Sequence, residues 1–410
     1  MATSGRVAYR TDRGAGSVPV TERRRRAGTG SPPGESGDDV TTLAKRHDMV
    51  VHEQEPYNAE PPRAALAEHV ITPTGTFYGR NHGPTPTIDP DAWRLRVDGL
   101  VATPLELSLA DLQERFAHRE VVATLQCAGN RRAGLMAHRD IPGQHPWGPG
   151  ATSTARWVGV RLADVLAAAG LEPRATDIEF TAPDVAAEAV PPQQYGGSIP
   201  TTKATAEETL LVWEMNGEAL TAAHGAPVRV VVPGHIGARS VKWVQRVTAR
   251  DRPSDNFFQQ GAYRLLPADT DTSRTRPGDG VALGAVALNS EVLTPDEGDE
   301  VPAGATTVTG YAFAGDDRTV VRVDVTADGG TTWTQADLDE QVSPWAWRFW
   351  RATLDLPPGR VDITARAWDS TAAVQPEHAA TVWNPKGYIN NSWPTVTVTV
   401  QAHPEGTTQR

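Results

Sequence analysis

The pattern of apolar and polar residues first predicts alternating strands and helices. "WRLRVDGLV" (93–101) alternates like a half-buried strand, and "EVVATLQC" (120–127) is a strand rich in β-branched residues. "SLADLQERF" (108–116) and "RLADVLAAAG" (161–170) have helical spacing. The first begins with serine at the N-cap position, and the second ends with glycine at the C′ position. This mixed order predicts an α+β domain over roughly 60–270.

The pattern changes in the last third of the chain. "PVRVVVPG" (227–234) and "VKWVQRV" (241–247) still predict one buried and one half-buried strand. A polar joint follows at 267–280, and short strands with turn signals and no helical periodicity come after it. The Asp-Gly-Gly sequence at 328–330 is a strong hairpin signal. We therefore expect an immunoglobulin-like β-sandwich over 281–402.

The N-terminal segment predicts no packed structure. Residues 1–55 are rich in glycine, proline, serine and charge, which is typical of a disordered tail. Its arginine run, "ERRRR", is not followed by the apolar stretch of an export signal. No apolar run reaches the ~18 residues that a membrane helix needs. We therefore expect a cytoplasmic protein without membrane association.

Charge and cysteine content exclude some functions. The chain has 39 Lys and Arg against 50 Asp and Glu, a formal net charge of −11. That balance disfavours nucleic acid and anionic lipid as partners. An anionic substrate would require a local cluster of basic side chains. The single cysteine excludes an internal disulfide and suits a reducing compartment.

Cys127 is the only cysteine, and three interpretations compete for it. A free cysteine is most often a small buried apolar residue, but it can also be a nucleophile or a metal ligand. Ala128 and Gly129 leave room for a large group near the backbone, and Arg131 and Arg132 favour the thiolate. No zinc-ligand spacing is present. Among metal sites, the best fit is one thiolate on a metal whose other ligands come from a sulfur-rich organic cofactor.

Several stretches occur in the order found in a known family. "TLQCAGNRR" resembles the molybdenum-binding segment of the sulfite oxidase family, and the resemblance covers roughly 56–395. The chain is therefore identified as a member by resemblance. The other matching stretches are "NAEPP" (58–62), "TFYGRNHGPTP" (76–86), "HGAPVRVVVPGHIGARSVKW" (224–243), "FFQQGAYRLLP" (257–267) and "WAWRFW" (345–350).

This resemblance implies a site for a compact oxyanion. Cys127 corresponds to the metal ligand, and the tyrosine near the metal is Tyr263. Arginine provides charged, planar donors that replace the water lost by an anion such as sulfite. The implied substrate arginines are Arg80, Arg132 and Arg348.

The resemblance also implies the cofactor, Mo-molybdopterin with one molybdenum per chain. Lysine, arginine, histidine and serine suit its phosphate, and Asp184 suits the N–H groups of the pterin. The implied cofactor-binding residues are Tyr78, Arg80, Asn81, His82, Cys127, Asp184, His224, Arg229, Ser240 and Lys242.

The implied activity is oxidation of sulfite to sulfate. Arg348 and Tyr263 favour sulfite, whereas "RLLP" after the tyrosine resembles nitrate reductases; nitrate or sulfoxide reduction on the same fold is the alternative. We expect no haem domain before residue 56 or after residue 400, so that electrons pass to an external acceptor, a cytochrome or oxygen. The expected domains are a molybdopterin domain over 56–275 and a sandwich over 281–402, which would form a homodimer.

Overall fold

The computed structural model describes residues 45–402. Most of the predicted tail, up to residue 44, lies outside the described residues. Its predicted boundary at 55 is too late, because β1 (Val50–Glu53) already pairs with β2 (Asn58–Glu60). No helix within 45–402 has the length and apolar character needed to cross a membrane.

One antiparallel sheet of the first domain carries Cys127 at the end of a strand. The strand that leads to Cys127 lies at an edge of this sheet and pairs with its neighbour over nine positions, from His118 opposite Val160 to Gln126 opposite Thr152. Both faces of this sheet contribute buried apolar side chains, among them Leu125 and Val160. Its strands are β5 (His118–Gln126), β6 (Thr152–Arg161), β9 (Leu210–Met215), β10 (Glu218–Ala219) and β11 (Arg229–Val231).

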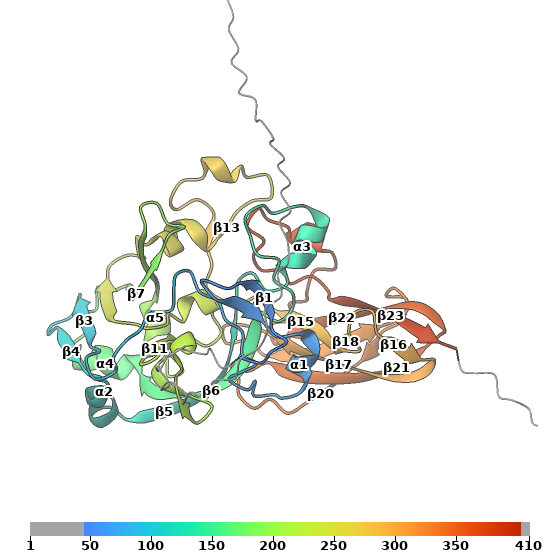
Figure 1. Ribbon diagram of the computed structural model, residues 1–410, viewed down its shortest axis with the longest axis horizontal. Coiled ribbons are helices and arrows are strands. Elements are labelled where there is room, and N and C mark those ends of the chain that lie inside the picture. Colours follow the sequence, from blue (N-terminus) through green and yellow to red (C-terminus); the bar gives the residue numbers. More distant parts are fainter. Residues whose placement is uncertain (1–44, 403–410) are drawn as a thin grey trace, which may run out of the picture. The chain divides into compact units, whose positions relative to one another are not determined.

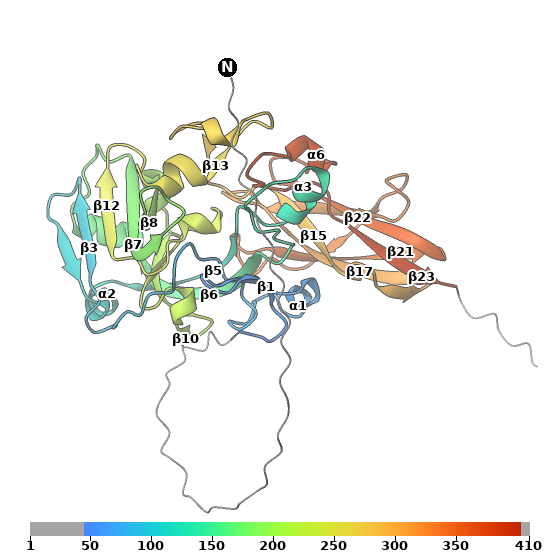
Figure 2. The ribbon, with the colours of Figure 1, turned by 45° about the horizontal axis from the view of Figure 1, so that its top comes forward.

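A second sheet of the first domain has one parallel pair. β12 runs parallel to β3 and antiparallel to β7, as Figure 2 shows. The strand predicted over 241–247 forms later, as β12, because Trp243 has a left-handed backbone with φ of 52°. The strands are β3 (Leu95–Gly99), β4 (Leu105–Leu107), β7 (Asp177–Ala186), β8 (Gln193–Pro200) and β12 (Arg246–Arg250).

Helices are present but short, and the longest have seven residues. Ser108 caps α2 in a capping box with Asp111, as predicted. Gly170 has φ of +70° just after α4, where a side chain would be strained. The α-helices are α1 (Arg63–Ala67), α2 (Leu109–Arg115), α3 (Arg132–His138), α4 (Leu162–Ala168), α5 (Thr201–Ala204) and α6 (Ala379–Val382). Single turns are η1 (Ala222–His224), η2 (Gly237–Arg239), η3 (Phe258–Ala262) and η4 (Thr272–Arg274).

The last third of the chain folds as two packed sheets, drawn in orange to red in Figure 1. β22 alternates buried and outward residues, so that Ile363 and Ala365 face the shared core. The predicted turn at Asp328 joins β18 to β19, with positive φ at Gly329 and Gly330. One sheet contains β15 (Asn289–Thr294), β17 (Gly304–Phe313), β20 (Asp337–Leu338) and β21 (Arg348–Leu356). The other contains β16 (Glu300–Pro302), β18 (Val320–Thr326), β19 (Thr334–Gln335), β22 (Gly359–Asp369) and β23 (Thr395–Gln401).

The first domain extends further along the chain than predicted, past the polar joint at 267–280. β14 (Val281–Ala282) pairs with β13 (Arg264–Leu265), so the sandwich begins with β15 rather than at 281. In the opposite direction, the sandwich contacts the Cys127 sheet directly: Thr124 donates its backbone N–H to the Trp345 carbonyl at 2.9 Å. The two domains therefore meet beside the strand that ends at Cys127.

Candidate active site

Cys127 lies at the end of β5, in a loop held by backbone hydrogen bonds. Its N–H donates to the Ala151 carbonyl at 2.9 Å, and the Gly129 N–H points to the Cys127 Sγ at 3.4 Å. The side chain is buried and borders a cavity. A Cβ on Gly129 would lie 2.5 Å from the Arg132 guanidinium, so glycine is required for this close approach.

The cavity beside Cys127 brings most of the implied residues together. It contains about 640 Å³ of empty space, part of which is open to solvent. Every implied cofactor-binding residue lines it, and so does Tyr263. The lining from these residues is Tyr78, Arg80, Asn81, His82, Cys127, Asp184, His224, Arg229, Ser240, Lys242 and Tyr263.

One end of this cavity is strongly basic. Arg229 is buried and donates only to carbonyls, among them those of His224 at 3.0 Å and Ser240 at 2.9 Å. Lys242 donates to the Ala223 carbonyl at 3.0 Å and to the Asn81 side chain. Within the described residues, neither cation forms an ion pair with a carboxylate. Burial lowers the pKa of Arg229 to about 10 and holds the pKa of Lys242 well below its usual range.

A further lysine, not identified from the sequence, reaches the same end. Lys45 donates to the Thr74 carbonyl at 2.8 Å and the Phe77 carbonyl at 2.7 Å, and lies 2.7 Å from His224 Nε2. Burial holds the pKa of His224 well below its usual range, so the imidazole is neutral and accepts from Lys45. Buried cations without counter-ions are costly, and a bound anion such as a phosphate would relieve that cost.

Asp184 supplies a test of whether a pterin fits. Its Oδ1 is buried and has no hydrogen-bond partner. Burial raises the pKa of Asp184 to about 6, although Lys242 opposes this rise. An unpaired buried acceptor is expensive unless a donor arrives with a ligand. A group with a phosphate and several N–H donors therefore matches both the basic end and Asp184.

The adjacent residues Arg131 and Arg132 have different partners and different roles. Arg131 pairs with Glu291 of the sandwich at 2.9 Å and donates to the Ser392 carbonyl at 2.8 Å, which is a structural role. Arg132 donates to the carbonyls of Gly387 and His145, at 3.1 and 3.0 Å. Burial lowers the pKa of Arg132, and the nearby Cys127 and Arg80 side chains also act on it. Arg132 therefore lies beside the cysteine, just outside the cavity lining.

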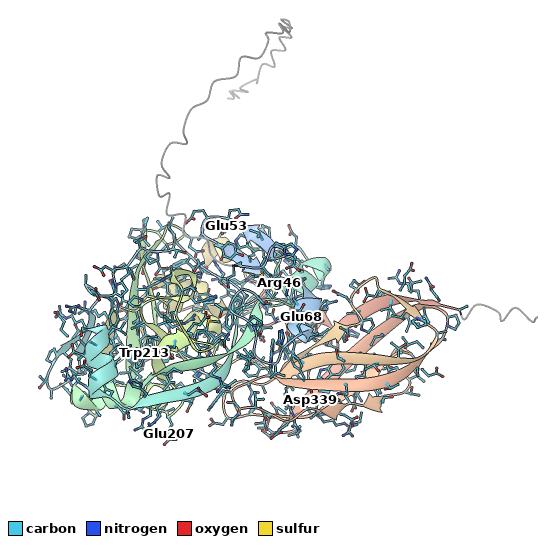
Figure 3. All side chains as sticks on the ribbon, turned by 60° about the horizontal axis from the view of Figure 1, so that its bottom comes forward. Arg46, Glu53, Glu68, Glu207, Trp213 and Asp339 are labelled. Carbon is cyan, nitrogen blue, oxygen red and sulfur yellow. The ribbon has the colours of Figure 1, made fainter. Side chains whose placement is uncertain are left out.

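Arg348 is not brought to this site, and its implied role there is wrong. Its guanidinium donates to the carbonyls of Asp339 at 2.7 Å and Val320 at 3.3 Å, both within the sandwich. Asp339 is labelled on the sandwich in Figure 3. The preceding Trp347 does contact the first domain, through Thr124 Oγ1 at 2.8 Å. The "WAWRFW" segment thus meets the Cys127 sheet, but its arginine points away from it.

Other site residues come from a segment that the sequence did not single out, "WNPKGYIN" (383–390). The Tyr388 ring stacks on Tyr263 with 5.6 Å between centroids and lies 5.3 Å from the Arg132 guanidinium carbon. Lys386 donates to the carbonyls of Gly261 and Ala262, just before Tyr263. Burial raises the pKa of Tyr388 to about 12 and lowers that of Lys386. The only sequence signal was an aromatic and a lysine in a stretch without strand periodicity.

Comparison with known proteins shows to which class of protein this site belongs. Residues 82–258 match the oxidoreductase molybdopterin-binding domain, and residues 282–401 match the Mo-co oxidoreductase dimerisation domain. The cavity with its single thiol thus belongs to the molybdopterin-binding class of oxidoreductases.

Individual relatives show which family within this class the chain belongs to. Sulfite oxidase of Gallus gallus is 44% identical over 357 residues, covering 84% of this chain and 76% of that protein. Sulfite oxidase of Arabidopsis thaliana is 36% identical over 367 residues, covering 84% and 92%. The chain belongs to the sulfite oxidase family. In structure it is similar to the sulfane dehydrogenase SoxCD from Paracoccus pantotrophus, with a TM-score of 0.73, 27% identity and coverage of 90% and 96%.

Proposed function

We propose that this protein oxidises sulfite to sulfate with a molybdenum cofactor and passes the electrons to an external acceptor, a cytochrome or oxygen. The observation that supports this best is the single buried thiol, Cys127, which lines a cavity suited to a pterin phosphate. Two arginines without carboxylate partners, Arg80 and Arg132, lie near it. Family membership supports the same reaction.

The residues present suit the cofactor in three places. Cys127 would supply the protein's sulfur ligand to the metal. The basic end, with Lys45, Arg229 and Lys242, would hold the phosphate. Asp184 would accept hydrogen bonds from the pterin. When bound, the cofactor supplies the two-electron redox chemistry, and the protein supplies orientation and electrostatics.

Arg80 and Arg132 would orient the substrate beside Cys127. Arg80 is half-buried at the cavity and donates to Asn58 Oδ1 at 3.3 Å and to the Asn81 carbonyl. Neither arginine forms an ion pair with a carboxylate within residues 45–402, so both charges remain for an anion. Tyr263, with its hydroxyl at the cavity, would contact substrate oxygen. Oxidation of sulfite to sulfate consumes one water and releases two electrons and two protons.

The C-terminal sandwich is assigned an immunoglobulin-like fold and a role in a symmetric homodimer. Two sheets with an alternating core and the match to a dimerisation domain support this assignment.

A metal analysis combined with an activity assay tests the function. The purified protein should contain one molybdenum per chain and reduce ferricyanide when sulfite is added. Cys127→Ser should remove sulfite oxidation, because the metal loses its protein sulfur ligand. Molybdenum without sulfite turnover, or nitrate reduction instead, would contradict the substrate. Normal turnover by Cys127→Ser would contradict the ligand.

A further inference from the structure

Strand β2 is buried along its whole length, although two of its three residues are polar. Asn58 has no exposed surface, and Glu60 is almost completely buried. Side chains two positions apart in a strand lie on the same face, so both point to one side of β2. A buried amide and a buried carboxylate are costly unless hydrogen-bond partners meet them. Their partners therefore show which parts of the molecule this strand holds.

The Glu60 carboxylate fixes the backbone of residues 147–151. Its Oε1 accepts from the Gly148 N–H at 2.6 Å, and its Oε2 accepts from the Gly150 N–H at 2.8 Å. His52 Nε2 also lies 2.8 Å from Oε1. An ionised carboxylate accepts at both oxygens, as this arrangement requires. Glu60 is therefore the point at which residues 147–151 are attached to β2.

Residues 147–151 in turn hold the loop that contains Cys127 and Arg132. Three of their carbonyls accept backbone N–H groups of residues 127–133, at 2.8 to 3.0 Å. The pairs are Ala151 with Cys127, Gly148 with Arg131 and Trp147 with Ala133. Cys127 is thus bonded directly, and Arg132 lies between two bonded neighbours. A shift of residues 147–151 would therefore move both the thiol and the arginine.

Asn58 holds the opposite side of the site. Its Oδ1 accepts from the Asn81 N–H at 2.7 Å and from Arg80 Nη1 at 3.3 Å. Between the two polar residues, the Ala59 backbone pairs with the Gly79 backbone at 3.0 and 2.9 Å. The residues on both sides of Arg80 are therefore hydrogen-bonded to β2.

We propose that strand β2 sets the spacing between the two sides of the active site, with Asn58 and Glu60 as positioning residues. Glu60 places the loop with Cys127 and Arg132, and Asn58 places the segment with Arg80. The use of this spacing in sulfite oxidation rests on the proposed function. Two arginines bind one compact anion together only when their separation matches its size, because the guanidinium donors have fixed directions.

Glu60→Gln tests the side that contains the metal ligand. A glutamine at this position turns an amide donor toward one of the two backbone N–H groups, so residues 147–151 must shift and Cys127 with them. We expect the electron paramagnetic resonance spectrum of the chemically reduced holoprotein to change its g values. This measurement needs bound molybdenum but no sulfite turnover. A spectrum identical to that of the wild type would overturn the role of Glu60, whereas a wild type without a molybdenum signal would contradict the proposed function itself.

Sulfite kinetics at matched molybdenum content test the spacing. Asn58→Ala and Glu60→Gln should each lower kcat/KM by about ten- to a hundredfold, since a misplacement of about 1 Å has effects of that size. Most of the loss should be in KM, because the displaced arginines bind the anion. A variant with the kcat/KM of the wild type would overturn the positioning role of its residue.

The matched control is Asp98→Asn, another buried carboxylate changed to its amide. Asp98 pairs with Arg246 at 2.7 Å and accepts from Thr248 at 2.9 Å, both in the second sheet. This variant should lose stability to denaturant but keep the spectrum and kcat/KM of the wild type. Equal changes in Asp98→Asn and Glu60→Gln would show that Glu60 acts only through stability, which would overturn the proposal.

Gly148→Ala disturbs the same contact from the other side and applies if Glu60→Gln does not fold. Its Cβ would lie 3.3 Å from Glu60 Oε1, so the loop must move by a few tenths of an ångström. The g values and kcat/KM should change in the same direction as in Glu60→Gln, by a smaller amount. A wild-type spectrum together with wild-type kinetics would again overturn the role of Glu60.

Discussion

Adjacent residues in one motif have separate tasks here. Arg131 forms an ion pair with Glu291, across the domain boundary. Arg132 donates hydrogen bonds to carbonyls, and its charge stays unpaired beside Cys127. The left-handed backbone of Arg131, with φ of 62°, sends the two side chains in different directions. A backbone turn at one residue thus separates a structural arginine from a substrate arginine.

Substituting Arg132 and Arg348 separately tests which arginine meets the substrate. Arg132→Met should raise KM for sulfite about tenfold or more, since a charge-assisted hydrogen bond is worth about 1.5–3 kcal/mol. Arg348→Met should leave KM unchanged, because its guanidinium is held by Asp339 and Val320. Steady-state kinetics at matched molybdenum content measures both. A raised KM in Arg348→Met would restore it to the site, and an unchanged KM in Arg132→Met would remove Arg132.

The site residues predicted from sequence were those inside motifs. Cys127 directly follows β5 and Tyr263 directly follows η3, whereas Arg80 follows only the isolated bridge between Gly79 and Ala59. Tyr388 and Lys45 were missed because only tertiary packing brings them to the site. Arg348 failed for a related reason: its motif places the segment at the domain contact, but pairing of β21 with β17 sets where the side chain points.

At the scale of helices and strands, local sequence signals predicted where helices begin or end better than they predicted the extent of a strand. The Ser108 cap and the Gly170 stop fix α2 and α4, since both depend on neighbouring backbone groups. The strand expected over 241–247 starts later, because positive φ at Trp243 breaks it. No local sequence pattern indicates that break. It accompanies a tertiary contact, in which the Trp243 Nε1–H donates to the Ala222 carbonyl at 2.8 Å.

The buried ion pair between the loop after β5 and strand β15 should be important for stability. Glu291→Gln leaves the Arg131 charge buried without a counter-ion, and losing one partner of such a pair costs about 3–5 kcal/mol. Both side chains are less than a tenth exposed. Denaturant unfolding would measure the loss of free energy.

A matched control is Glu120→Gln, which breaks an ion pair with Arg156 at the surface. Both of its partners are nearly half exposed, so the cost should be below about 1 kcal/mol. If Glu291→Gln were as stable as this control, the Arg131–Glu291 pair would not hold the domains together.

At the scale of the whole molecule, charge and site have opposite signs. A chain with a net charge of −11 surrounds a cavity lined by cations. Composition disfavours nucleic acid as a partner, but it could not locate the basic cavity, which depends on residues far apart in sequence. The two-part organisation was predictable, because periodicity changes between the parts. Their contact was not, since it joins Thr124 to residues more than 200 positions later.

The assembly is a prediction at the same scale. The match of residues 282–401 to a dimerisation domain predicts a particle of twice the 44.0 kDa chain mass. Sedimentation velocity at micromolar concentration measures this. A single monomeric species across that range would contradict the assigned role of the sandwich.

The segment that contains Tyr388 has a consequence for how the protein is made. Ile389 donates its N–H to the Ala128 carbonyl at 2.8 Å, and Asn390 Nδ2 donates to the Arg131 carbonyl at 2.8 Å. The loop around Cys127 is thus fastened by residues synthesised some 260 positions later. During translation, this loop leaves the ribosome long before its fastening exists. A pocket ready to take its cofactor would therefore form only after residues 389 and 390 have been synthesised, which places cofactor insertion after that point.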